Sequence, residues 1–319
     1  MTAPNATSCA LYDGNPVCFT FKDVPFYYSP KEHLVEGYSD PILALAAPII
    51  AYWVASLFFH FLDTSNWKWL ERYRIHESAE VKSRNLASVS DVIYAVIFQQ
   101  VLQTVLGYFW IEDHGNHVHQ MAKMQEWART LAPYILPCVE GQLKPKLLHD
   151  SAYWVYWWVI PSAQFFGAMF VIDTWQYFLH RFMHVNKWFY KHLHSVHHRL
   201  YVPYAFGALY NHPVEGFVLD TLGAVIAEAV TGMTSRQALV LFAVSSLKTV
   251  DDHCGYRFPL DPLQLLTSNN ADYHDIHHQI IGIKSNFAQP FFVHWDTILG
   301  TRMTRAEFEA RKAKSRKAQ

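Results

Sequence analysis

The stretch Ala152–His184, AYWVYWWVIPSAQFFGAMFVIDTWQYFLHRFMH, decides how this chain must fold. It is apolar and compatible with a helix, with Pro161 as its interruption. A helix of this length extends about 50 Å, whereas the hydrocarbon core of a bilayer is about 30 Å thick. We therefore predict a helix that crosses a membrane and projects beyond it, carrying His180 and His184 just outside the bilayer.

Three histidine clusters follow from the end of this stretch: His180-Arg-Phe-Met-His184, His194-Ser-Val-His197-His198 and His274-Asp-Ile-His277-His278. Spacings of three or four residues place imidazoles on one face of a helix. Imidazole ligands suit Zn, Cu, Fe and Ni, and eight ligands exceed what one ion holds. The clusters predict a two-metal site with the ligands His180, His184, His194, His197, His198, His274, His277 and His278.

Two further histidines extend this set. His253, in Asp251-Asp-His-Cys-Gly-Tyr256, is a ninth candidate ligand. His212 is a tenth candidate, either as a ligand or as a hydrogen-bonding support for one. Metal-bound histidines usually donate their other N–H to a carboxylate, a carbonyl or water. Carboxylates that could accept such bonds are Asp173, Glu215, Asp251, Asp252, Asp272 and Asp275.

The composition is that of a membrane protein, with 51% hydrophobic and only 17% charged residues, against about 25% charged in soluble domains. Residues 42–62 and 92–111 carry no Asp, Glu, Lys or Arg and are long enough to cross a bilayer. Residues 216–247 read as a hairpin of two short helices with a turn at 231–236. We predict an all-α, polytopic membrane protein with about four transmembrane helices, one or more as helical hairpins, and a cytosolic histidine-rich helical cap.

The distribution of basic residues predicts the orientation. Basic loops prefer the cytosol, which places residues 63–90 and the tail from Arg302 there and the N-terminus on the lumenal side. The basic 112–150 loop does not follow this rule. A glycosylation sequon at Asn5 agrees with a lumenal N-terminus. Because the 216–247 hairpin enters and leaves at one face, all three clusters become cytosolic. Lys plus Arg (26) balances Asp plus Glu (27), so no nucleic-acid partner is indicated.

The clusters, following hydrophobic spans as HxxxH, HxxHH and HxxHH, resemble the fatty acid hydroxylase / sterol desaturase superfamily of membrane non-haem di-iron enzymes. The short motifs do not separate its members. Longer strings resemble the sphinganine C4-hydroxylase (sphingolipid C4-monooxygenase) branch, particularly fungal members. The resemblance covers about residues 150–302 and reaches the N-terminal half only in hydropathy. The strings are Asn211–Phe217, Asp251–Tyr256, Asn269–Gln279, Gly282–Phe292, Trp295-Asp296 and Gly300-Thr301.

The resemblance implies a multi-pass enzyme of the endoplasmic reticulum membrane with two Fe ions facing the cytosol and O₂ as co-substrate. It would hydroxylate carbon 4 of sphinganine (or dihydroceramide) to 4-hydroxysphinganine (phytosphingosine) in sphingolipid biosynthesis. Electrons would come from NAD(P)H through cytochrome b5 and its reductase as separate proteins, because the chain has no His-Pro-Gly-Gly haem motif. The family's ligands match the eight cluster histidines, and His253 completes the set by position.

Four regions follow from these patterns. Residues 1–41 are a polar, lumenal segment expected to be poorly structured, and residues 42–149 form an N-terminal membrane hairpin and loop. Residues 150–302 form a fatty acid hydroxylase-type catalytic domain, and residues 303–319 form a basic cytosolic tail. The apolar helices 152–179 and 216–247 would form the substrate channel. Candidates to meet the polar headgroup, or alternatively to cap loops or to hydrogen-bond to the metal ligands, are Asn269, Asn270, Asp272 and Tyr273.

Other functions compete with this hypothesis. The metal motifs alone do not distinguish hydroxylation from desaturation or sterol methyl oxidation on the same scaffold. A non-enzymatic membrane protein stabilised by zinc is an alternative of another class. Structural zinc sites usually have four ligands, often including Cys, so nine histidines exceed that need. The sequence leaves open whether the free long-chain base or the ceramide is the substrate, and what the oligomeric state is.

Overall fold

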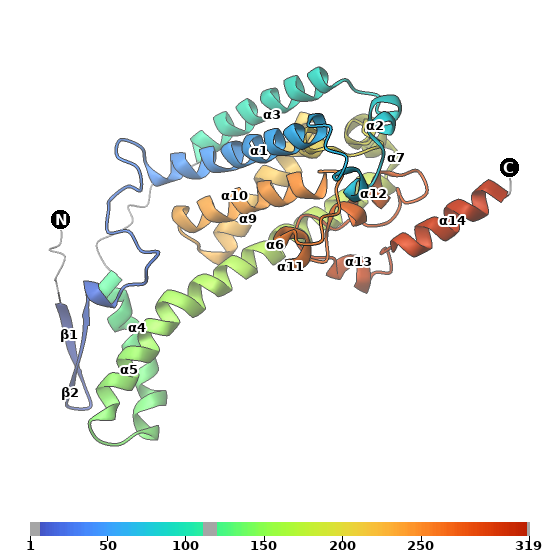
Figure 1. Ribbon diagram of the computed structural model, residues 1–319. Coiled ribbons are helices and arrows are strands. Elements are labelled where there is room, and N and C mark those ends of the chain that lie inside the picture. Colours follow the sequence, from blue (N-terminus) through green and yellow to red (C-terminus); the bar gives the residue numbers. More distant parts are fainter. Residues whose placement is uncertain (1–6, 111–119, 318–319) are drawn as a thin grey trace.

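The structure is a computed structural model that describes residues 7–110 and 120–317, so the sequon at Asn5 lies outside the described residues. Apart from one β-hairpin, the regular elements of these residues are helices (Figure 1). The prediction of a helical, polytopic membrane protein is confirmed.

Three helical stretches are long and apolar enough to cross a membrane: α1 (Asp40–Thr64), α3 (Val89–Trp110) and Leu143–Val185. They match the three predicted spans. The third consists of α5 (Leu143–Trp154), the π-helical turn η4 (Val155–Val159) and α6 (Ile160–Val185). Its 43 residues extend about 65 Å, far more than a bilayer requires. Pro161 lies in the first turn of α6, directly after the π-helical turn η4.

Residues 222–252 form the predicted helical hairpin, with α9 (Leu222–Thr231) and α10 (Ser235–Asp252) as its arms. Gly232 ends α9 with a φ of 61°, a conformation that favours glycine. The side chains of Thr234 and Gln237 then cap the start of α10. Arg236 pairs with Asp40, so the tip of the hairpin lies level with the first turn of α1. The hairpin therefore reaches the same depth as α1, which packs along α10 (Figure 1).

The N-terminal segment differs from the expected poorly structured lead-in. Strands β1 (Thr7–Tyr12) and β2 (Asn15–Thr20) pair in antiparallel register, joined by Asp13-Gly14, and Cys9 lies opposite Cys18 in a disulfide. Asp13 and Gly14 both have positive φ, as a tight two-residue hairpin turn requires. The hairpin packs on α5 and α4 (Gln120–Ile135) through a shared apolar core. The Asp-Gly turn was the sequence signal for this element.

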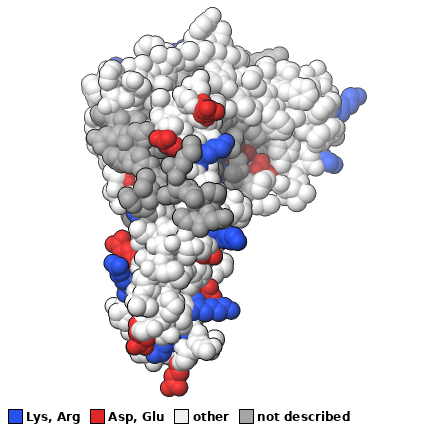
Figure 2. Space-filling model, turned by 90° about the vertical axis from the view of Figure 1, so that its left-hand side faces the viewer, with Lys and Arg blue, Asp and Glu red and all other residues white. Residues whose placement is uncertain are grey.

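Charged side chains are distributed unevenly over the surface. Figure 2 shows Lys, Arg, Asp and Glu gathered on the narrow lower part of the molecule, while the broad upper part is largely uncharged on this face. The lower part contains the β-hairpin, α4 and α5 (Figure 1). Exposed apolar side chains on the helices, such as Val54, Leu57 and Phe58 of α1, agree with contact with lipid.

The opposite end of the helices is covered by short segments. The core beneath them joins α1, α3 and α10, and it includes hydrogen bonds from Tyr52 to the Phe206 carbonyl (2.8 Å) and from Trp53 to Gln100 (2.9 Å). The glutamines of α3 thus face protein. The covering segments are α2 (Ser78–Arg84), α7 (Lys187–Phe189), η5 (Tyr190–His194), η6 (His197–Arg199), η7 (Ala205–Leu209), α8 (Pro213–Gly216), η8 (Phe217–Thr221), α11 (Pro262–Leu266), α12 (Ala271–His278), α13 (His294–Ile298) and α14 (Arg305–Lys317).

Candidate metal centre and substrate pocket

The nine predicted ligand histidines converge at this covered end in two adjoining groups. One holds five histidines and the other holds four, and within each group the ligand nitrogens lie within 4.8 Å of one another. All nine side chains are buried. The five-histidine group comprises His180, His184, His194, His198 and His277, and the four-histidine group comprises His197, His253, His274 and His278.

The five-histidine group joins the end of α6 to η5, η6 and α12. The Nε2 atom of His184 lies 3.2 Å from that of His180, 2.7 Å from that of His194 and 3.1 Å from that of His277. The Nε2 atom of His198 lies 3.0 Å from that of His194. His180 and His277, which are 97 positions apart along the chain, therefore have ring nitrogens in the same small region.

The four-histidine group joins η6, the end of α10 and α12. The Nε2 atom of His274 lies 3.0 Å from those of His253 and His278. The Nε2 atom of His197 lies 3.5 Å from that of His253. His253 enters the group because it directly follows the last residue of α10, so the hairpin ends at the site.

In six of the nine rings, the Nδ1 atom forms a hydrogen bond with an acceptor outside the two groups. The Nδ1–H of His180 donates to the Phe287 carbonyl (2.8 Å), that of His277 to Ser285 (2.7 Å) and that of His278 to Leu200 (2.8 Å). His197 and His253 donate to the Tyr210 and Thr249 carbonyls, and His194 donates to the Glu215 carboxylate. Since a neutral imidazole has one N–H, this places a lone pair on each Nε2.

Burial keeps these rings neutral. Removal from water lowers the pKa of His197 to about 4 and that of His253 to about 3. It also lowers the pKa values of His194, His198 and His277 well below the usual histidine range. Neutral imidazole is the form that binds a metal ion.

This donor set fits two metal ions. Bare lone pairs facing one another at about 3 Å repel each other unless a cation lies between them. Two nitrogens bound at about 2.1 Å from one ion and at right angles lie about 3 Å apart, which is the spacing found here. Five and four histidines, with no carboxylate in either group among the described residues, favour a nitrogen-binding transition metal over Mg²⁺ or Ca²⁺.

One loop supplies two of the six acceptors. The loop at 285–292 provides the Ser285 and Phe287 carbonyls, and its position is fixed by buried carboxylates. Asp296 accepts hydrogen bonds from the N–H groups of Phe287 (3.1 Å) and Ala288 (2.6 Å). Asp173, in α6, accepts from the N–H groups of Phe291 and Phe292. Asp173, a predicted acceptor for a ligand N–H, instead contacts the loop that carries these acceptors.

The other predicted carboxylates have distinct positions. Glu215, 1% exposed, directly accepts the His194 N–H. Asp275 pairs with His76 and Arg305, and Asp252 pairs with Lys248. His76, which was not among the predicted site residues, links residues 71–84 to α12 through Asp275. Asp251 accepts from Gln264 (3.1 Å), and Asp272 pairs with Arg305 (2.8 Å).

The remaining candidate residues lie outside both groups. His212 is the N-cap of α8, and its Nδ1 accepts the Val214 N–H (3.2 Å). Asn270 caps α12, and Asn269 donates to Asp252 (3.2 Å) and to the Pro290 carbonyl (2.9 Å). Tyr273 donates to Asp296. The four headgroup candidates thus form caps, hydrogen bonds or ion pairs within the protein.

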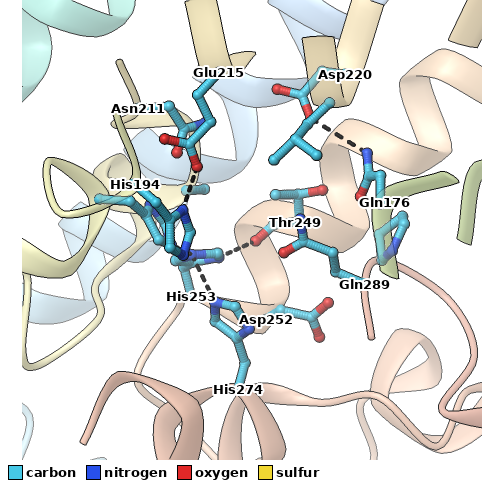
Figure 3. Close-up of a pocket in the computed structure, with 14 residues that line it drawn as sticks. Gln176, His194, Asn211, Glu215, Asp220, Thr249, Asp252, His253, His274 and Gln289 are labelled. Carbon is cyan, nitrogen blue, oxygen red and sulfur yellow. Dashed lines mark hydrogen bonds and ion pairs between the residues drawn. The ribbon is translucent and has the colours of Figure 1, made fainter. Parts of the chain in front are cut away.

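A polar pocket adjoins the four-histidine group (Figure 3). His197, His253 and His274 form one side of it together with His194. Its other walls come from α6, α8, η8, α10 and the loop before Pro290, which sequence spacing could not bring together. They include Gln176, Asn211, Glu215, Asp220, Thr249, Asp252 and Gln289.

Fold and site together define a polytopic helical membrane protein with two buried histidine groups that could each hold a metal ion. The fatty acid hydroxylase family model matches residues 165–301, and the chain belongs to this family. It is 48% identical to a sphingolipid C4-hydroxylase of Saccharomyces cerevisiae over 85% of this chain and 74% of the relative. It is 43% identical to a sphinganine C4-monooxygenase of Arabidopsis thaliana over 83% of this chain and 88% of the relative.

It is also 42% identical to a very-long-chain aldehyde decarbonylase of Oryza sativa over 84% of this chain and 91% of the relative. No solved structure matches the chain. The predicted superfamily and branch, and the prediction of a hydroxylase enzyme, are confirmed.

Proposed function

We propose that this protein hydroxylates carbon 4 of the long-chain base sphinganine, or of dihydroceramide, to give 4-hydroxysphinganine (phytosphingosine) in sphingolipid biosynthesis. The observation that carries the proposal is the convergence of nine neutral histidines in two groups, in a chain similar over most of its length to sphingolipid C4-hydroxylases. Nine histidines exceed the four ligands of a structural zinc site. A polar pocket beside the groups supports binding of the polar part of a substrate.

The nine histidines would hold two iron ions, which supply O₂ activation when bound. In the balanced reaction, the C4–H bond, O₂, two electrons and two protons give C4–OH and one water molecule. An unactivated C–H bond presents no acidic proton, so the reaction requires no general base. The chain must instead hold carbon 4 in place, because small misplacement strongly lowers the rate.

The protein's own residues do this holding in two ways. Backbone carbonyls and Glu215 fix the imidazole rings through their Nδ1 atoms, which sets the positions of all six corresponding Nε2 atoms. The apolar faces of α6 and of the α9–α10 hairpin would line the path of the alkyl chain. Burial of the two groups excludes bulk water from the reacting carbon.

Cytochrome b5 and its reductase, using NAD(P)H, are the proposed electron source. This requires the histidine groups to face the cytosol, and we propose the endoplasmic reticulum as the membrane. The Cys9–Cys18 disulfide lies at the end of the molecule opposite the histidines, and disulfides persist in oxidising compartments such as the lumen. The basic helix α14 is at the histidine end, in agreement with cytosolic placement.

Lipid mass spectrometry tests the proposal in cells that lack their own sphinganine hydroxylase. We expect 4-hydroxysphinganine to appear when this chain is expressed and to be absent with an inactive variant inserted equally well in the membrane. A C4 double bond without a new oxygen would instead identify a desaturase, and an oxidised sterol methyl group a sterol oxidase. Absence of 4-hydroxylated base despite inserted, iron-loaded protein would overturn the substrate assignment.

A further inference from the structure

The pocket beside the four-histidine group contains two carboxylates with incomplete hydrogen bonding. The Oε2 atom of Glu215 and the Oδ2 atom of Asp220 are buried and have no hydrogen-bond partner among the described residues. Their other oxygens accept bonds from His194 and, at 3.3 Å, from Gln176. Figure 3 shows both carboxylates at the same side of the pocket.

Unpaired carboxylate oxygens in a buried site are costly unless they bind something. The pocket lining includes no Lys or Arg among the described residues. The nearby Lys248 is already paired with Asp252. An incoming cation with N–H donors would therefore complete this pocket, whereas an anionic group would be repelled.

The proposed substrate carries such a cation close to its reacting carbon. In sphinganine the ammonium is on carbon 2 and hydroxyls are on carbons 1 and 3, so a single carbon separates the amine-bearing carbon from carbon 4. The group that recognises the amine must consequently lie next to the metal ligands. The walls at Asn211, Thr249 and Gln289 offer neutral polar groups for the two hydroxyls.

We propose that Asp220, together with the free oxygen of Glu215, binds the ammonium of a free sphingoid base, so that the enzyme prefers the base before N-acylation over the ceramide. The inference rests on the proposed function and deepens it. Asp220 is a positioning residue in this arrangement: it aligns carbon 4 with the histidine groups. An N-acylated substrate is neutral at this nitrogen, so it cannot form the ion pair with Asp220 and Glu215.

The first test compares substrates on the full-length enzyme in lipid nanodiscs, supplied with iron and an electron donor. The substrates are sphinganine and octadecane-1,2,3-triol, its uncharged analogue. We expect the wild type to favour sphinganine in kcat/KM by at least about tenfold. Asp220→Asn should bring this ratio close to one. Asp63→Asn is the matched control, because Asp63 is a partly buried carboxylate outside the pocket that pairs with Arg74, and it should keep the wild-type ratio.

Iron content is measured in each variant. If Asp220→Asn loses iron or lowers both activities while keeping the wild-type ratio, Asp220 balances the charge of the metal centre and the proposal is overturned. A wild-type ratio close to one would also overturn it.

A second test uses the wild type alone and remains valid if Asp220→Asn does not fold. We expect octadecylamine to compete with a bound fluorescent lipid at a concentration at least about tenfold lower than octadecanol. Equal competition would refute an ammonium site. Hydroxylation of dihydroceramide but not of sphinganine would refute the inference and leave the proposed function standing. Failure to hydroxylate either lipid would refute the proposed function, while the amine comparison still reports on the pocket.

Discussion

At each end of the molecule, side chains that are apart in sequence lie close together. At one end a disulfide joins them, and at the other two groups of histidines face one another. Near the N-terminus, a disulfide joins Cys9 to Cys18, nine positions apart in one hairpin. At the opposite end, histidines between positions 180 and 278 face one another through nitrogens that mostly carry lone pairs. The first link is a covalent bond within the chain, whereas the second is a set of nitrogen atoms that could hold cations. We infer that the histidine end carries the chemistry and that the disulfide end contributes stability.

The largest effect should follow from removing a ligand. His277→Ala should lower product formation by more than about 100-fold, because even changes to residues that support a ligand cost about 10–100-fold in metal affinity or activity. The measurement is product per unit of membrane-inserted protein, together with iron content. His192→Ala is the matched control, since His192 is exposed and hydrogen-bonds only locally to Trp188 (2.9 Å). Retained activity in His277→Ala would remove this residue from the site.

The turn between α12 and the loop at 285–292 should be almost as sensitive. A Cβ atom at Gly282 would lie 2.0 Å from the Ile276 carbonyl oxygen, so Gly282→Ala must displace α12 or the loop that follows it. We expect a loss of activity of about 100-fold, since a 1 Å misplacement can cost that much. Gly167→Ala is the control, because its Cβ would make an ordinary 3.5 Å contact with Thr231. Equal activities of the two variants would contradict the tight packing assigned to this turn.

A smaller effect is expected when only the charge on a supporting residue is removed. Glu215→Gln keeps an oxygen that can accept from His194 but lacks the negative charge. Metal affinity should fall by about tenfold, at the lower end of the range for such partners. The chelator concentration that removes half of the metal measures this change. Glu307→Gln, at an exposed helix start, should leave that concentration unaltered, and an equal value for Glu215→Gln would show that Glu215 does not support the ligand.

The smallest effect on catalysis should come from the disulfide end. Replacing both Cys9 and Cys18 by Ser should destabilise the β-hairpin by about 2–3 kcal/mol, because the unfolded hairpin gains freedom. Hydroxylation per folded molecule should stay within about twofold of wild type. Proteolysis of the N-terminal segment reports the first quantity and a lipid assay the second. A large loss of activity in correctly inserted protein would contradict the inference that the disulfide end contributes only stability.

Much of the helical architecture was predictable because its signals are local. The three spans follow from continuous apolar runs, and the turn of the α9–α10 hairpin follows from residues around Gly232. The cluster spacings predicted a shared metal site, and the structure brings His253 together with them. These features depend on residues close together in sequence, or on clusters that chemistry alone makes improbable.

The polar pocket beside the histidines was not predictable in the same way. Gln176, Asp220 and Gln289 come from three separate elements, and nothing in their local sequence indicates that they meet. The headgroup candidates Asn269 and Asn270 were selected for proximity in sequence to the last cluster, whereas their side chains hydrogen-bond to the protein itself. Tertiary packing, which spacing does not encode, decides which polar residues near a cluster remain available to a ligand.

The central claim is that this chain inserts one oxygen atom from O₂ at carbon 4 of a sphingoid base. Its most direct test supplies sphinganine carrying two deuterium atoms on carbon 4 to the iron-loaded enzyme under ¹⁸O₂. We expect a product that has lost one deuterium, retains the other and contains one ¹⁸O, as mass spectrometry would show. Loss of deuterium without incorporation of ¹⁸O, or incorporation with both deuterium atoms retained, would contradict hydroxylation at this carbon.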